Sequence, residues 1–383
     1  MKFRVERDVL ADAVAWAARS LPVRPSVPVL AGLMIEAGPL DGGGEGLQLS
    51  TFDYETSARA TLSAEVSAEG KALVSGRLLA DICRSLPDKP VEMVLEGSRV
   101  SLTCGSARFS LQTLPVEEYP ALPPMPTASG TVNSDVFAAA VAQAVTAAGR
   151  DDMLPVLTGV RIEIDGSTIS LLATDRFRLS QRELPWDPNT PDESLAALVP
   201  AKVLADTAKS LTGGGQVTIA LAARGAGEGI IGFEGSAPGG VRRTTTRLLD
   251  GEFPKVRSLF PSEHLTVAKV DRAALIESVK RVALVAERNT AVQLAFSDGV
   301  LTLDAGSGDE AQASESVEAS IEGADLTTGF NPQFLLDGLT AIEEPIVELA
   351  FTQASKPVVI SGSTEGGDDS GFRYLLMPRR LLS

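Results

Sequence analysis

The sequence predicts an α+β protein built from three copies of one domain, each with two helices and antiparallel sheets. Residues 5–36 align without a gap with residues 132–163, at an offset of 127. A fainter third copy lies a further 138 residues on, around Val270. A period of about 130 residues is the size of a domain and is far longer than the period of a solenoid repeat. The first prediction is therefore a threefold repeat of whole domains.

A second motif also occurs three times and supports the same conclusion. It is VSGRLLADICRSL from Val74, VPAKVLADTAKSL from Val199 and FNPQFLLDGLTAI from Phe330. The motif places three aspartates at equivalent positions, which are Asp81, Asp206 and Asp337.

Each copy is expected to begin with an amphipathic helix, because DVLADAVAWAARS carries apolar residues at 3–4 spacing. Strands follow in LAGLMIEA, LQLSTFDYETSARATL and GKALV, then the second helix, then strands in VEMVLEG, RVSLTC and ARFSLQTL. Each domain is thus a helix and sheet repeated twice. The six expected helices cover residues 7–20, 76–86, 134–150, 201–211, 271–288 and 332–342.

Two proline-rich stretches, residues 114–130 and 253–265, separate the copies. Repeated prolines fix extended backbone and make stiff connections. The predicted domains are therefore residues 1–127, 128–262 and 263–383.

The charge is distributed unevenly. The chain carries 34 basic and 50 acidic residues, for a net charge of −16, which argues against non-specific adhesion to nucleic acid. The six expected helices nevertheless hold eleven basic and nine acidic residues. A surface made from these helices can face phosphates while the rest repels them. The alternative is that the helices carry mixed charge only for solvation.

Composition predicts a cytoplasmic protein with no membrane segment. No window approaches 18 consecutive apolar residues, and the N-terminus lacks a signal-peptide core. The two cysteines, Cys83 and Cys104, are too few for a disulfide framework. We expect Cys83 to be a buried free thiol, because it lies in an apolar helix pattern.

Nothing positive supports an enzyme. The single histidine, His264, rules out a multi-histidine metal site and leaves little scope for a Ser-His-Asp arrangement. We expect it to be an ordinary surface residue. No zinc, phosphate-loop or nucleophile motif occurs. We therefore predict no catalytic residue, no metal and no cofactor.

Several motifs together resemble one family, the bacterial DNA polymerase sliding clamp, which is the beta subunit of the replicative polymerase. They are PVLAGLMIE, FDYETSA, LPVEEYPALP, PVLTGVRIE, ATDRFRLS, DGEFPKVRSLFP and the C-terminal YLLMPRRL. The resemblance covers the whole chain. It implies a head-to-tail homodimer, a six-domain ring around duplex DNA with helices lining the hole, and no intrinsic chemistry. It also implies binding of the polymerase III alpha subunit, the clamp loader and other proteins that carry the clamp-binding motif.

The resemblance suggests which cations contact DNA. Arg24, Arg150 and Arg288 fall at similar places after the first helix of each copy. The other expected phosphate contacts are Arg77, Arg84, Lys202, Lys209, Lys280 and Arg281. For each of them, a purely solvated charge is the alternative.

Motif matches also imply a dimer interface and a peptide pocket. Phe109 and Leu284 would be apolar anchors between protomers, although Phe109 could equally be an ordinary core residue. The pocket would lie between the second and third domains. It would use Leu157, Thr174, Arg176, Phe177, Arg178, Leu179, Pro254, Ser258, Leu259, Asn331, Phe334, Pro357, Val358, Leu375, Leu376, Met377, Pro378, Arg379 and Arg380.

The chain departs from the family at the edge of this pocket. The family usually has an apolar residue after Met-Pro, where this chain has Arg379, and Ser258 stands where some relatives have a larger polar or basic residue. A buried unpaired charge is costly, so Arg379 should turn outward or find a carboxylate. Three interpretations stay open: a housekeeping clamp with a drifted pocket edge, a specialised second clamp that resists a cyclic peptide antibiotic, and a scaffold that only titrates clamp partners.

Overall fold

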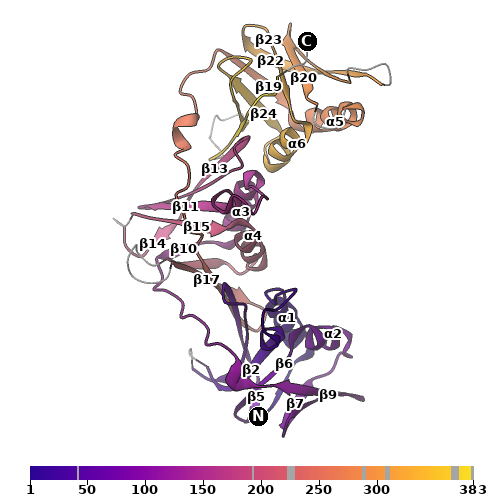
Figure 1. Ribbon diagram of the computed structural model, residues 1–383, viewed down its shortest axis with the longest axis vertical. Coiled ribbons are helices and arrows are strands. Elements are labelled where there is room, and N and C mark those ends of the chain that lie inside the picture. Colours follow the sequence, from indigo (N-terminus) through magenta and orange to yellow (C-terminus); the bar gives the residue numbers. More distant parts are fainter. Residues whose placement is uncertain are drawn as a thin grey trace. The chain divides into compact units, whose positions relative to one another are not determined.

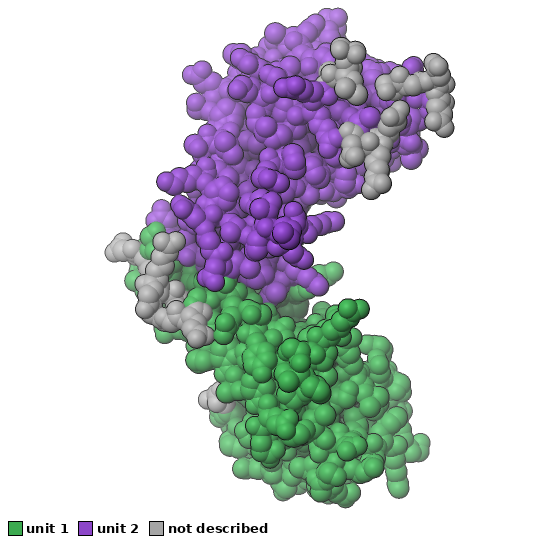
Figure 2. All heavy atoms as spheres, viewed as in Figure 1, with its two compact units in different colours: residues 1–138, 186–195, 206–248 green, residues 139–185, 196–205, 249–383 purple. Residues whose placement is uncertain are grey.

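The computed structural model describes residues 1–40, 43–191, 194–221, 229–286, 290–306, 311–363 and 371–380. The chain divides into two compact units (Figure 2). Unit 1 comprises residues 1–138, 186–195 and 206–248, and unit 2 comprises residues 139–185, 196–205 and 249–383.

The first repeat lies wholly in unit 1 (Figure 1). It follows the predicted order of elements except that a short strand, Lys2–Val5, precedes the helix with which the repeat is expected to begin. Its helices are α1 (Arg7–Ala18) and α2 (Gly76–Ser85), with short 3-10 turns η1 (Pro28–Ala31) and η2 (Val116–Glu118). Its strands are β1 (Lys2–Val5), β2 (Gly32–Pro39), β3 (Glu45–Phe52), β4 (Thr56–Ser63), β5 (Glu65–Ala68), β6 (Gly70–Ser75), β7 (Val91–Glu96), β8 (Arg99–Cys104) and β9 (Ala107–Leu114).

The second repeat contributes to both units. Its helical elements are α3 (Ser134–Ala144), η3 (Val145–Ala147), η4 (Pro155–Thr158) and α4 (Ala201–Ser210). Its strands are β10 (Gly130–Asn133), β11 (Gly159–Asp165), β12 (Thr168–Thr174), β13 (Arg178–Pro185), β14 (Asp187–Pro188), β15 (Ser194–Pro200), β16 (Gln216–Leu221), β17 (Ile230–Ala237) and β18 (Gly240–Arg247).

The third repeat lies in unit 2. Its helical elements are η5 (Arg257–Leu259), α5 (Arg272–Val282), η6 (Ala283–Val285) and α6 (Pro332–Ala341). Its strands are β19 (Thr266–Asp271), β20 (Val292–Ser297), β21 (Val300–Ala305), β22 (Ala313–Gly323), β23 (Leu326–Phe330), β24 (Ile346–Phe351), β25 (Val358–Ser363) and β26 (Phe372–Leu376).

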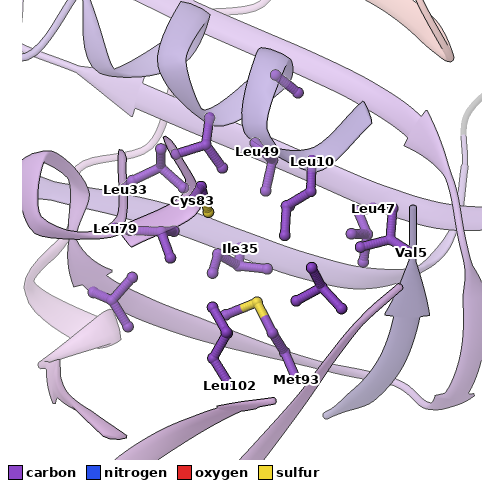
Figure 3. Close-up of a cluster of buried hydrophobic side chains, with 14 of the residues drawn as sticks. Val5, Leu10, Leu33, Ile35, Leu47, Leu49, Leu79, Cys83, Met93 and Leu102 are labelled. Carbon is purple, nitrogen blue, oxygen red and sulfur yellow. The ribbon is translucent and has the colours of Figure 1, made fainter. Parts of the chain in front are cut away.

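The apolar spacing of the helices is explained by their burial. In the first repeat, Leu10 of α1 and Leu79 and Cys83 of α2 point at Ile35 and Leu49 of the sheet (Figure 3). All five side chains are completely inaccessible to solvent. Cys83 is therefore the buried free thiol that its sequence context predicts, and burial raises its pKa to about 12.

Adjacent repeats are joined by one strand pairing of the same kind. The last strand of the second repeat, β18, pairs antiparallel with β4 of the first, with Thr244 opposite Ala58. The last strand of the third repeat, β26, pairs with β13 of the second, with Tyr374 opposite Ser180. These pairings extend the sheets to 14 strands in unit 1 and 12 in unit 2.

Two predicted helices are too long. Helix α3 ends at Ala144, before a 3-10 turn that stops at Ala147, and α5 ends at Val282, before the turn Ala283–Val285. Within their observed bounds the six helices carry eight basic and seven acidic residues, so the basic excess is smaller than predicted. Among the described residues, no helix is long and apolar enough to cross a membrane.

Candidate peptide surface and candidate nucleic-acid contacts

A tight turn after β12 presents the first predicted peptide-binding residues. The Asp175 carboxylate accepts hydrogen bonds from the backbone N–H groups of Phe177 and Arg178, at 3.0 and 3.1 Å. Arg176 has a left-handed backbone, with φ of 79°. Because the turn folds this way, Arg176 is exposed, Phe177 is 54% exposed and Arg178 points inward.

Arg178 is a buried charge in unit 2. Its side chain is 6% exposed and makes two ion pairs, from Nε to Asp175 at 2.9 Å and from Nη1 to Asp337 at 2.6 Å. Its Nη1 also lies 3.4 Å from the Tyr374 hydroxyl, and its guanidinium lies 4.3 Å from the centre of the Phe334 ring. Although burial opposes the charge, the contacts with Tyr374, Asp337 and Asp175 raise the pKa of Arg178.

Three apolar side chains form what we call the peptide surface, namely Phe177, Phe334 and Met377. The rings of Phe177 and Phe334 are 6.3 Å apart. The Met377 backbone N–H donates to the Phe177 carbonyl at 2.9 Å, which holds the C-terminal segment beside the turn. Asn331 caps α6 by accepting from the N–H groups of Gln333 and Phe334, and so fixes where Phe334 stands. These residues come from three distant parts of the sequence.

A buried apolar cluster supports this region from below. Leu179 and Leu375 pack with Phe253, Val256 and Val359. Phe253 and Val256 belong to the proline-rich stretch between the second and third repeats, which therefore packs into unit 2 rather than bridging open solvent.

An ion-pair network also holds the proline-rich stretch, residues 253–265. Arg257 pairs with Glu163 at 2.7 Å and with Glu183 at 3.2 Å. Burial alone would raise the pKa of both carboxyls. Hydrogen bonds outweigh it, and the pKa of each lies below its ordinary value: Arg161 and Arg257 donate to Glu163, and Arg257, Gln181 and Ser170 donate to Glu183.

The predicted pocket residues divide into support and exposed surface. The buried ones are Leu157, Thr174, Arg178, Leu179, Val358, Leu375 and Leu376. Those at intermediate exposure are Asn331, Phe334, Pro357, Pro378 and Arg379, and those exposed are Arg176, Phe177, Pro254, Ser258, Leu259, Met377 and Arg380.

Arg379 is half-buried, and its backbone N–H donates to the Gly329 carbonyl of β23 at 2.8 Å. The segment after Met377 is thus held against the strand that leads into α6. Ser258 is exposed on the turn Arg257–Leu259.

The motif matches missed two residues of the site, Asp337 and Tyr374. Asp337 was detectable as the third of the repeated aspartates. Tyr374 is the first residue of the matched motif YLLMPRRL but was not assigned to the pocket, and its hydroxyl donates to the Phe334 carbonyl at 2.8 Å across 40 residues. Such a contact depends on the tertiary fold and has no local sequence pattern.

The predicted DNA contacts are exposed wherever the structure describes them. They are Arg24, Arg77, Arg84, Arg150, Lys202, Lys209, Lys280 and Arg281, whereas Arg288 lies outside the described residues. Arg77 donates to the Pro22 carbonyl at 3.2 Å, near Arg24 in sequence. Three of the cations are paired with acids on the surface: Arg84 with Asp81, Lys280 with Glu277 and Arg281 with Glu315.

The two predicted interface anchors differ in exposure. Leu284 is 84% exposed on the turn after α5. Phe109 of β9 is half-buried and packs against the core of the first repeat. His264 is exposed, as predicted, and no cluster of metal-ligating side chains occurs among the residues that the structure describes.

Three family models match consecutive parts of the chain. They are the N-terminal, central and C-terminal domains of the DNA polymerase III beta subunit, at residues 1–123, 131–255 and 257–380.

Similar proteins cover the whole length. The beta sliding clamp of Streptomyces coelicolor is 59% identical over 100% of both chains. The beta sliding clamp homolog GriR of Streptomyces muensis is 45% identical over 99% of both. The crystal structure of the Bacillus subtilis sliding clamp matches with a TM-score of 0.89 at 26% identity and 100% coverage of both chains. A Pseudomonas aeruginosa clamp bound to griselimycin matches with the same score, identity and coverage.

Three repeats joined strand to strand, with a shared surface where the second meets the third, define a DNA sliding clamp, the processivity factor of a polymerase. The chain belongs to the DNA polymerase III beta subunit family. The resemblance seen in the sequence motifs is therefore confirmed.

Proposed function

We propose that two copies of this chain close head to tail into a ring around duplex DNA and tether polymerase III, the clamp loader and other motif-bearing proteins. The observation that carries the proposal is a pair of unmatched strand edges. In the part of the chain that the structure describes, β9 pairs through residues 107–112 with β8 alone. The first half of β22, residues 313–318, pairs with β21 alone.

These two edges are the missing partners of a third junction. By strand register, Phe109 is equivalent to Thr244 and Tyr374, and Ala313 is equivalent to Ala58 and Ser180. Since Thr244 faces Ala58 and Tyr374 faces Ser180 within the chain, the same rule sets Phe109 opposite Ala313 of a second copy. The last strand of the first repeat would thereby pair with the third repeat of the other protomer. Such a heterologous contact closes when two copies use it reciprocally.

A ring explains how an acidic protein can act on DNA. Topological linkage replaces the many phosphate contacts that ordinary affinity requires. Cations on the helices and in the segments after them would suffice to keep the duplex centred: Arg24, Arg77, Arg84, Arg150, Lys202, Lys209, Lys280 and Arg281, with Arg288 outside the described residues. The acidic remainder discourages binding in other orientations.

Partners would dock a short peptide on the peptide surface. Phe177, Phe334 and Met377 offer two aromatic faces and a flexible thioether, which suit leucine and aromatic anchors. The protein would need no cofactor and carry out no chemistry, because any ATP is used by the loader. It would act in the cytoplasm, with domains of residues 1–127, 128–262 and 263–383.

A loading assay tests the proposal. Purified protein, clamp loader and ATP are incubated with a nicked circular plasmid, and DNA-bound clamp is counted after gel filtration. The protein should stay on the circle and leave when a restriction enzyme makes the circle linear. Failure to load, with peptide binding intact, would instead support a scaffold that only titrates partners.

A second candidate is a specialised clamp that tolerates a clamp-directed ligand. It is favoured by Arg379 and by the 45% identity to GriR. The 59% identity to the Streptomyces coelicolor clamp favours the general role.

Titration calorimetry distinguishes the specialised clamp from the general one. Griselimycin and a peptide from the polymerase alpha subunit are titrated into the natural protein and into Arg379→Val. A specialised clamp should bind the peptide tightly and griselimycin weakly, with griselimycin binding restored in the variant. Equal affinities in both proteins would exclude that role.

A further inference from the structure

We infer that Asp337 is a positioning residue for the peptide surface: its negative charge holds Arg178 under Phe334, and this makes the second junction a docking site while the first is not. The inference deepens the proposed function and rests on it. It is drawn from comparing the two junctions that occur within this one chain.

The two junctions have the same backbone turn. In the first, Asp53 accepts from the N–H groups of Glu55 and Thr56 at 2.9 and 2.7 Å, and Tyr54 has φ of 76°. In the second, Asp175 accepts from the two equivalent N–H groups, and Arg176 has φ of 79°. The turn alone therefore does not make a binding site.

The side chains behind the turn differ completely. Where the second junction has Arg178, the first has Thr56, whose hydroxyl bonds that of Thr246 at 3.0 Å. Where the second has Tyr374 and Phe334, the first has Thr244 and Val203 at the equivalent positions. The first junction thus lacks an aromatic ring at the positions of Tyr374 and Phe334 and a cation at the position of Arg178.

The three repeated aspartates differ in their contacts. Asp81 is exposed and pairs with Arg84 one turn away, and Asp206 is exposed. Asp337 alone of the three reaches a buried arginine from another repeat, and its second oxygen accepts from Gln333 at 2.7 Å. The next residue, Gly338, leaves room for the Tyr374 ring beside the Asp337–Arg178 pair, because an added Cβ at Gly338 would lie 2.4 Å from that ring. The other repeats carry Ile82 and Thr207 at that position.

The Asp337–Arg178 pair therefore fixes the positions of the Phe334 ring and of the turn at Asp175. Arg178 contacts the Asp175 carboxylate on one side and the Phe334 face on the other, so its position sets the spacing of Phe177 and Phe334. Without the Asp337 charge, the buried Arg178 cation would be paired with one carboxylate, that of Asp175, instead of two. Removing one partner of a buried ion pair is strongly unfavourable. Arg178 would move toward solvent and withdraw support from Phe334.

The test compares two substitutions of opposite character. Asp337→Asn keeps the shape and removes the charge, whereas Asp337→Glu keeps the charge and adds bulk. Titration calorimetry with the polymerase alpha-subunit peptide should show a loss of affinity of roughly tenfold or more for Asp337→Asn, given the cost of an unpaired buried charge, and substantial recovery for Asp337→Glu. Asp206→Asn, at the equivalent position, should bind as the natural protein does.

Each other outcome overturns the inference. If Asp337 acts through helix packing alone, Asp337→Glu should bind the peptide more weakly than the isosteric Asp337→Asn. Equal peptide affinity of the natural protein, Asp337→Asn and Asp337→Glu would show that the charge is irrelevant. Arg178→Met, which removes the cation that Asp337 holds, covers the case in which Asp337→Asn does not fold, and unchanged affinity there would also contradict the inference. If the natural protein does not bind the peptide, the proposed function fails first, and this inference with it.

Discussion

At the scale of single residues, the site depends on small side chains as much as on charged ones. Gly338 lies on α6 directly beneath the Tyr374 ring, and no other residue type fits there without displacing that ring. The nearby Arg178 is held from three directions, so the ring and the cation form one packed unit.

We predict that Gly338→Ala destabilises the protein despite the better helix propensity of alanine. Overpacking a buried site typically costs about 1–3 kcal/mol, which exceeds the gain of up to about 1 kcal/mol from replacing glycine in a helix. Thermal unfolding should show a lower melting temperature than that of Thr340→Ala, an exposed position on the same helix. A variant at least as stable as the natural protein would show that Tyr374 can move freely.

At the scale of elements, the order of the helices and of most strands followed from the sequence because each apolar stripe has one face to bury. The short strands that open the repeats, β1, β10 and β19, were not predicted. The ends of α3 and α5 did not follow, since both continue as 3-10 turns with helix-compatible residues. The motifs predicted Phe177, Phe334 and Met377 as site residues. They did not predict the ion pairs behind them, because Asp337 and Arg178 are 159 residues apart and meet only in the folded chain.

The stretch between the second and third repeats should be sensitive to acid. The pKa values of Glu163 and Glu183 are lowered in the folded state, so their contribution to stability is present above the ordinary carboxyl range. It is lost as pH falls through the lowered values. The pairs are half-exposed, which limits the contribution to about 0.5–1 kcal/mol.

Arg257→Gln provides the check. The variant should melt lower than the natural protein at pH 7, and the difference should shrink as the pH falls below about 4, near the ordinary carboxyl pKa. Lys255→Gln, an exposed neighbour in the same stretch, serves as the control. A difference that is independent of pH would mean that Arg257 acts through packing.

At the scale of the whole molecule, the threefold repeat sets the assembly. Three repeats form two junctions within the chain. The two edges that a third junction would use, on β9 and on the first half of β22, are left for a second copy. The proposed dimer uses both, and its register is fixed by the internal junctions.

Phe109→Asp should therefore convert the dimer to a monomer. A charge placed opposite Ala313 would be buried without a partner, which costs several kcal/mol at an interface. Sedimentation velocity gives the mass, and peptide affinity should stay unchanged because the peptide surface lies in unit 2. Val241→Asp, on a strand that already has both neighbours, is the matched control, and a dimer that survives Phe109→Asp would reject the register.

The open edges also bear on how the protein survives before it assembles. An unpaired strand is a template for uncontrolled addition of further strands, the first step of aggregation. Both edges here carry charge, with Arg108 exposed on β9 and Glu318 exposed on β22. Charged side chains on an open edge disfavour its pairing with an apolar strand of another chain. The lone protomer is thus protected during synthesis at the same two edges that later join the two copies.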